Sequence, residues 1–135
     1  MSAVKYWIWL ASRCGVGRRS VKRILEKFSD AENIYFARES DYRDIGLAPA
    51  EMRSLTDKDL SPARKIIETC GKLNIGILTY GDPLYPERLK NIFDPPAVLY
   101  YRGVMPVIDE EPVVGMVGTR KCTEYGYRTA ERIGY

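Results

Sequence analysis

The chain has 135 residues, of which 45% are hydrophobic and 29% charged, and its formal net charge is +3. These proportions are ordinary for a globular protein and exclude a largely disordered chain. The sequence holds no histidine, which excludes histidine acid–base catalysis, Ser-His-Asp triads and most zinc sites. No apolar run approaches the ~18 to 20 residues of a membrane helix, and the three cysteines lie far apart. We therefore expect a protein of the reducing cytoplasm, with no membrane span, no disulfide framework and no metal site.

Residues 1–73 show the spacing of short helices. One helical stripe, at i, i+3, i+4 and i+7, is formed by Val21, Ile24, Leu25 and Phe28. A Ser29 cap with Glu32 three residues later predicts the start of another helix, and Ser61 before Pro62 predicts the start of a further one. Gly46 ends a short segment between them. The pattern predicts a bundle of four to six short helices.

After residue 74 the pattern changes to strands and turns. Residues 75–80, 97–101 and 113–117 predict three strands, and residues 86–91 predict one or two helical turns. A last helix is predicted from a Thr123 cap, with Tyr127, Ala130 and Ile133 as its apolar stripe. By content the chain is therefore α+β, with a helical domain at 1–73 and the start of a Rossmann-like α/β domain at 74–135. A doubly wound sheet needs further units, so we expect either an N-terminal fragment of a longer protein or a stunted last domain.

The first candidate site lies between the first two helices. Gly15-Val16-Gly17 has the pattern of a helix-hairpin-helix (SAM-like) turn, whose N–H groups can face a phosphate. Six positive charges and one negative charge, Glu26, surround it: Arg13, Arg18, Arg19, Lys22, Arg23 and Lys27. The predicted DNA contacts are Gly15, Gly17, Arg18, Arg19 and Lys22. The alternative is a tight helical corner with a solvated basic face.

The second candidate site follows the third predicted strand. Gly118 allows close approach of a ligand, Thr119 offers a hydroxyl, Arg120 a planar fork and Lys121 a point charge. Tyr125 could stack on a base or pack internally. These residues predict a phosphate site, but they do not separate a mononucleotide from a polynucleotide, or either from a turn that serves only the topology.

Two further segments are interpreted as having a structural role and no chemical one. The connection from Tyr80 to Gly103 is rich in proline and aromatic residues, and its Pro95-Pro96 pair is compatible with a cis bond. The acidic run Asp109, Glu110 and Glu111 is interpreted as a solvated loop, because it lacks the partners that a metal site needs.

These motifs carry a specific resemblance. Residues 75–135 resemble the family of the DNA-processing protein DprA, also called Smf, in the order and spacing of their motifs: Tyr85-Pro86, Leu89, Asp94-Pro95-Pro96, Leu99-Tyr100, Gly103, Val117-Gly118-Thr119-Arg120 and Tyr125-Gly126. The helical part around Gly15 and Gly17 is similar to the domain that many members place before their Rossmann-like domain.

The resemblance implies a cytoplasmic protein that binds single-stranded DNA in natural transformation (competence), protects it and helps load the recombinase RecA. It implies no catalytic residue and no cofactor, a homodimer in the whole protein, and phosphate binding at Gly118, Thr119, Arg120 and Lys121. Thr119 stands where serine is more usual. A second glycine-rich segment of the family, and its later dimer and RecA elements, are not among these residues.

Two other functions remain open at this point. A Rossmann-like nucleotide hydrolase or phosphorylase of the lysine-decarboxylase-like group shares the strand-turn-helix start and would bind a mononucleotide. Alternatively, the helical part could be a protein-interaction module with exposed aromatic anchors such as Trp7 or Tyr35.

Overall fold

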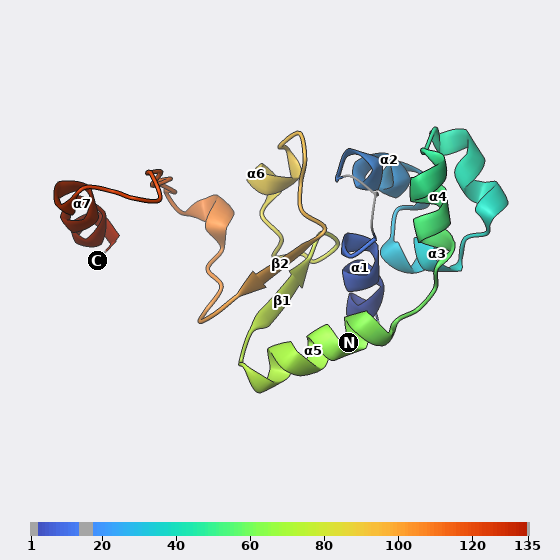
Figure 1. Cartoon of the computed structure of the whole chain (residues 1–135), viewed down its shortest axis with the longest axis horizontal. Helices are drawn as coiled ribbons and strands as arrows, with labels where there is room; N and C mark the ends of the chain where they lie inside the picture. Colours follow the sequence, from blue (N-terminus) through green and yellow to red (C-terminus); the bar gives the residue numbers. More distant parts are fainter. Residues whose placement is uncertain (1–2, 14–17, 135) are drawn as a thin grey trace.

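The computed structural model describes residues 3–13 and 18–134 of the chain (Figure 1). Its first part is helical, as predicted. The elements are α1 (Val4–Ala11), α2 (Arg18–Phe28), α3 (Ala31–Phe36), the 3-10 helix η1 (Glu39–Ile45), α4 (Pro49–Thr56) and α5 (Ser61–Lys72). The predicted bundle of short helices is therefore confirmed.

The ends of these helices follow local chemistry. The cap of α3 is Asp30, whose carboxylate accepts from the N–H of Glu32 at 2.8 Å, so the predicted Ser29 cap is wrong. Ser29 instead has a φ of 62° and turns the chain between α2 and α3. Gly46 ends η1 with a φ of 68°, the left-handed conformation that glycine adopts at low cost.

Two of the three predicted strands form. β1 (Gly76–Thr79) and β2 (Val98–Tyr101) pair antiparallel, with Gly76 opposite Tyr101 and Thr79 opposite Val98. The short helix α6 (Glu87–Lys90) lies between them in the chain. Every described peptide bond is trans, so Pro95-Pro96 does not supply a cis bond. The content is α+β, as predicted, but the structure does not confirm the Rossmann-like or the helix-hairpin-helix subdivision.

The third predicted strand, residues 113–117, is wrong. The structure assigns it neither helix nor strand, and Val113, Val114 and Val117 are exposed by 59%, 79% and 99%. Valine-rich sequence favours a strand only where a neighbouring strand supplies ladder hydrogen bonds and a packed face. Among the described residues the sheet contains β1 and β2 alone, so this segment has neither.

The core is centred on α1 and continues into the sheet. Trp9 is fully buried, and Trp7, Ile8 and Leu10 are almost so. Figure 1 shows α1 between the helices on one side and the two strands on the other, and Val98 of β2 belongs to the same buried cluster. Trp7 is 4% exposed, so it is not the surface anchor that an interaction module needs. The domain division at residue 73 stays a prediction.

A polar clamp holds the linker after α4 against α1. The Arg13 guanidinium donates to the Asp57 carboxylate at 2.9 Å and to its carbonyl at 3.0 Å. The Trp9 indole N–H donates to the same carbonyl at 2.8 Å. The Lys58 ammonium lies 5.0 Å from the Trp9 ring centroid and 5.4 Å from that of Tyr35, and it donates to the Tyr42 hydroxyl at 3.2 Å. Tyr35 thus packs in this cluster rather than serving as an anchor.

This cluster predicts an alkaline optimum of stability. Burial, with Arg13 nearby, lowers the pKa of Lys58 from 10.5 to about 8, and burial raises the pKa of Tyr42 from 10.0 to about 12. The Lys58 contribution is full above its unfolded pKa and is lost as the pH falls through about 8; the Tyr42 contribution is lost as the pH rises through about 12. We expect urea denaturation to show a rise of about 1 kcal/mol between roughly pH 7 and pH 10, since solvent screens a half-exposed ammonium, and a fall above that.

The matched control for this prediction is Lys58→Met, which keeps an apolar stem but cannot titrate. It should flatten the rise and leave the fall above pH ~10 in place. If the free energy of unfolding of the wild type is constant or falls between roughly pH 7 and pH 10, the lowered pKa of Lys58 is contradicted.

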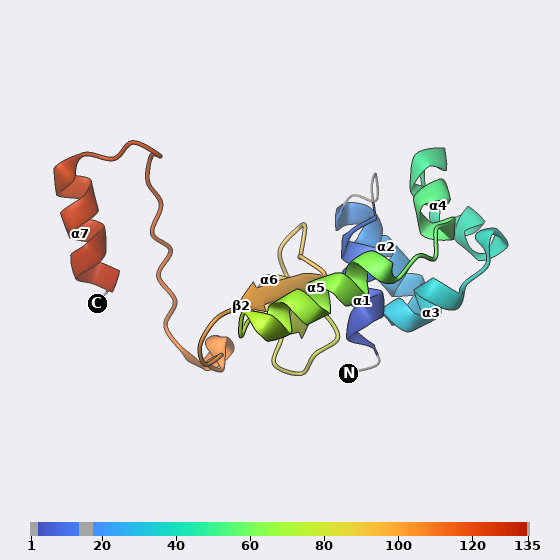
Figure 2. The same ribbon diagram turned by 60° about the horizontal axis from the view of Figure 1, so that its bottom comes forward.

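The remaining residues extend away from this core. In Figures 1 and 2, the chain after β2 passes the 3-10 helix η2 (Ile108–Glu110) and ends in α7 (Glu124–Gly134), which stands apart from the other helices in both views. None of the described helices is long and apolar enough to cross a membrane. Cys70 and Cys122 are both free thiols.

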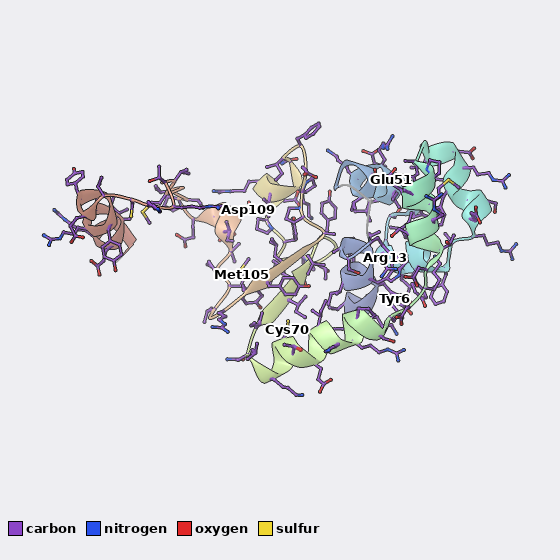
Figure 3. The ribbon with its side chains drawn as sticks, in the orientation of Figure 1. Tyr6, Arg13, Glu51, Cys70, Met105 and Asp109 are labelled. Carbon is purple, nitrogen blue, oxygen red and sulfur yellow. The ribbon has the colours of Figure 1, made fainter. Side chains whose placement is uncertain are left out.

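Asp109 has a structural role that its sequence context did not predict. Figure 3 labels it next to α6, where its carboxylate accepts from the N–H groups of Glu87 at 2.7 Å and Arg88 at 3.2 Å. The N–H of Glu87, more than any other group, holds the pKa of Asp109 below its ordinary value. The interpretation of Asp109 as part of a merely solvated run is therefore wrong: it caps α6 and ties η2 back to the sheet region.

Candidate nucleic-acid interface

The predicted phosphate site is an exposed turn at the N-terminus of α7. Gly118, Thr119, Arg120 and Lys121 are all exposed, and α7 begins three residues later. Thr123 caps this helix, as predicted: its hydroxyl accepts from the N–H of Gly126 at 3.2 Å. The helix is 11 residues long, so its dipole and free amide groups favour a negative charge at this end.

The donors of this turn are free to bind a ligand. Within residues 3–13 and 18–134, no protein group accepts a hydrogen bond from the N–H groups of Gly118–Lys121, and neither the Arg120 guanidinium nor the Lys121 ammonium has an ion-pair partner. The nearest helical carboxylate, Glu124, is paired with Arg128 at 2.9 Å. The local field at the turn is therefore set by two unpaired cations and a helix N-terminus.

The Thr119 hydroxyl is engaged within the turn. It donates to the carbonyl of Lys121 at 3.0 Å, so its proton is used locally. A phosphate would therefore meet the N–H groups and the two cations first, and Thr119 shapes the turn that presents them.

A hollow of about 650 Å³ adjoins the turn, between residues 114–119 and α7. Its lining includes Gly118, Thr119, Tyr125 and Gly126. Tyr125 is 80% exposed, which makes its ring available for stacking. The predicted apolar stripe of α7 is not buried: Tyr127 and Ile133 are 59% and 62% exposed, because no described sheet lies beneath the helix.

The helical corner is described only in part. Gly15 and Gly17, and the side chains of Arg18 and Arg19, lie outside the described residues, while Lys22 on α2 is exposed. Two of the charges counted there are engaged internally. The Arg13 side chain, 8% exposed, forms the clamp with Asp57, and Lys27 donates to the carbonyl of Asp41 at 2.7 Å. Arg13 is therefore a structural residue, and the basic face is smaller than the sequence suggested.

The two predicted sites do not form one site in this structure. In Figures 1 and 2, α7 stands on the far side of the two strands from α2. No cluster of three metal-ligating side chains occurs in the part of the chain that the structure describes. One exposed aromatic residue near α2, Phe93, was not predicted; it is 68% exposed and precedes Asp94-Pro95-Pro96.

Comparisons with known proteins agree with the resemblance. A family model described as DNA recombination-mediator protein A matches residues 76–135. Protein Smf of Synechocystis sp. is 33% identical over 134 residues, which is 95% of this chain and 33% of that protein. DNA processing protein DprA of Bacillus subtilis is 32% identical over 69 residues, 51% of this chain and 23% of that protein. That of Streptococcus pneumoniae is 35% identical over 52 residues, 38% of this chain and 18% of that protein.

Residues 76–135 match the family of DNA recombination-mediator protein A, and the chain is similar to the Smf and DprA proteins of these bacteria. It spans about a third or less of the length of these relatives, since it covers 33%, 23% and 18% of them. No solved structure matches it.

Proposed function

We propose that the protein is a recombination mediator of natural transformation that binds and protects single-stranded DNA, with the turn Gly118–Lys121 holding a phosphate. The observation that carries the proposal is this turn at the start of an 11-residue helix: its residues are exposed, and its two cations have no ion-pair partner among the described residues. The family match over residues 76–135 and the names of the relatives, which include DNA processing proteins, support DNA as the ligand.

The chemistry of the turn suits a polynucleotide. Arg120 offers a planar fork that fits two phosphate oxygens, and Lys121 adds a charge that attracts the backbone at longer range. Tyr125, close to the turn in the chain and 80% exposed, offers a face on which an unpaired base can stack. Bases in a duplex are already stacked, so a site of this kind favours single strands.

Other parts of the proposal rest on the family alone. They are a Rossmann-like domain continued by later segments, a homodimer, a contact that loads RecA, a cytoplasmic location and the absence of catalysis. The helix-hairpin-helix contact through Gly15, Gly17, Arg18, Arg19 and Lys22 is likewise proposed, and Lys22 is its exposed member among the described side chains.

A nucleotide hydrolase or phosphorylase would bind a mononucleotide in the hollow and would need a catalytic carboxylate further along the chain. The described residues that line the hollow beside Gly118 include no aspartate or glutamate. The unpaired donors of the turn and the exposed ring of Tyr125 suit a nucleic-acid backbone with its bases, which is why we place the mononucleotide second.

Thermal unfolding with two kinds of ligand tests the proposal. A ligand that binds only the native state adds RT ln(1 + [L]/Kd), or about 2.7 kcal/mol at a hundred times Kd. We expect an oligothymidylate to raise the melting temperature by several degrees and mononucleotides at the same nucleotide concentration to leave it unchanged. A larger shift with mononucleotides would favour the enzyme, and no shift with either would remove the DNA proposal.

A further inference from the structure

A second groove, of about 460 Å³, lies between α2 and the segment that follows α6. In Figure 1 the chain after α6 rises beside α2, so residues separated by about 70 positions in sequence face each other. The groove is lined by Lys22, Arg23, Glu26, Asn91, Ile92 and Phe93.

The cations of this groove are available to a ligand. Lys22 and Arg23 are exposed, and neither has an ion-pair partner within the part of the chain that the structure describes. The neighbouring cations are engaged within the protein, since Arg13 forms an ion pair with Asp57 and Lys27 donates to the carbonyl of Asp41. The one carboxylate in the lining is Glu26, so the groove is net positive and complementary to a polyanion.

The opposite wall of the groove carries two exposed apolar side chains. Phe93 is 68% exposed and Ile92 is 43% exposed. The segment that carries them is held at its C-terminal end, where the Tyr85 hydroxyl donates to the carbonyl of Pro96 at 2.7 Å and the N–H of Tyr80 donates to that of Ala97 at 2.9 Å. An exposed ring, on a segment held at one end, beside cations that have no ion-pair partner among the described residues is a combination that suits single-stranded nucleic acid without sequence reading.

We propose that this groove is a second contact for single-stranded DNA, with a base stacked on Phe93 and the flanking phosphates on Lys22 and Arg23. The inference deepens the proposed function and rests on it. It adds Arg23 and Phe93 to the proposed DNA contacts. The site is then formed by α2 together with the loop after α6, and not by the helical corner alone.

Fluorescence anisotropy with a labelled oligothymidylate at low salt tests the groove. Phe93→Ala should lower the affinity at least about fivefold, and Phe93→Tyr, which keeps the ring, should stay within about twofold of wild type. Lys22→Ala with Arg23→Ala should reduce the slope of log affinity against log salt by about 1.4, or ~0.7 for each lost phosphate contact.

Matched controls separate the groove from general charge and packing effects. Arg64→Ala with Lys65→Ala removes two neighbouring exposed cations from α5, and Phe36→Ala removes an aromatic ring that is 67% exposed on α3. Both should keep the wild-type salt slope and affinity. As a second readout, an iodouracil-containing oligonucleotide should crosslink to the wild-type peptide that contains Phe93.

The outcomes also separate this inference from the proposed function. If Arg120→Ala weakens binding while Phe93→Ala and the Lys22/Arg23 pair do not, the groove is overturned and the turn stands. If only the groove variants weaken binding, the groove stands and the turn is overturned. If wild type binds no oligonucleotide, both are lost; absence of a crosslink at Phe93 in a protein that does bind overturns the groove.

Discussion

Arg120→Ala should weaken the binding of single-stranded DNA about tenfold or more. A hydrogen bond to a charged group contributes ~1.5–3 kcal/mol, and Arg120 is exposed at the turn with no ion-pair partner among the described residues, so its guanidinium is free to make such a bond. Arg120→Lys should be intermediate, because lysine keeps the charge but cannot contact two oxygens with a planar fork.

The control for this variant is Arg53→Ala, which removes the same charge from an exposed position on α4. It should change the affinity by less than about twofold, since a lone distant charge is screened by salt. Equal losses in the two variants would show that net charge, rather than the turn, determines binding.

Trp9→Ala should destabilise the chain by ~4 kcal/mol. The indole is fully buried, donates to the Asp57 carbonyl at 2.8 Å and packs edge-on against Tyr35 with the ring centroids 5.1 Å apart. Loss of a buried tryptophan typically costs ~3–5 kcal/mol, a large fraction of the ~5–15 kcal/mol that stabilises a domain. Urea denaturation followed by circular dichroism should show a much lower midpoint, or no cooperative transition.

Phe36→Ala provides the comparison, because its ring is 67% exposed. It should cost about 1 kcal/mol or less. A Trp9→Ala midpoint close to that of Phe36→Ala would contradict a core centred on α1.

The helices were predictable because their determinants are local. The stripe from Val21 to Phe28 and the Thr123 cap need only neighbouring residues, and α2 and α7 both form. One failure was local, since Asp30 and not the neighbouring Ser29 caps α3. The other failures involve partners distant in sequence. Residues 113–117 have the composition of a strand, but a strand also needs a ladder neighbour, which the described residues do not provide.

The same distinction applies to the site. The turn Gly118–Lys121 was found from its residues, since its donors lie in one short segment. The clamp between Arg13 and Asp57 joins positions 44 residues apart, so no local pattern indicated that the charge of Arg13 is engaged. Phe93 was missed for the same reason: only the fold brings it to Lys22 and Arg23.

The phosphate site at Gly118–Lys121 can be tested directly by nuclear magnetic resonance of nitrogen-15-labelled protein titrated with an oligothymidylate. We expect the amide resonances of Gly118, Thr119, Arg120 and Lys121 to shift strongly and saturably, because their N–H groups donate to phosphate. The amide of Gly103, in the loop after β2, should stay in place. Saturable binding that leaves the four turn amides unmoved would contradict the assignment of this turn as a phosphate site.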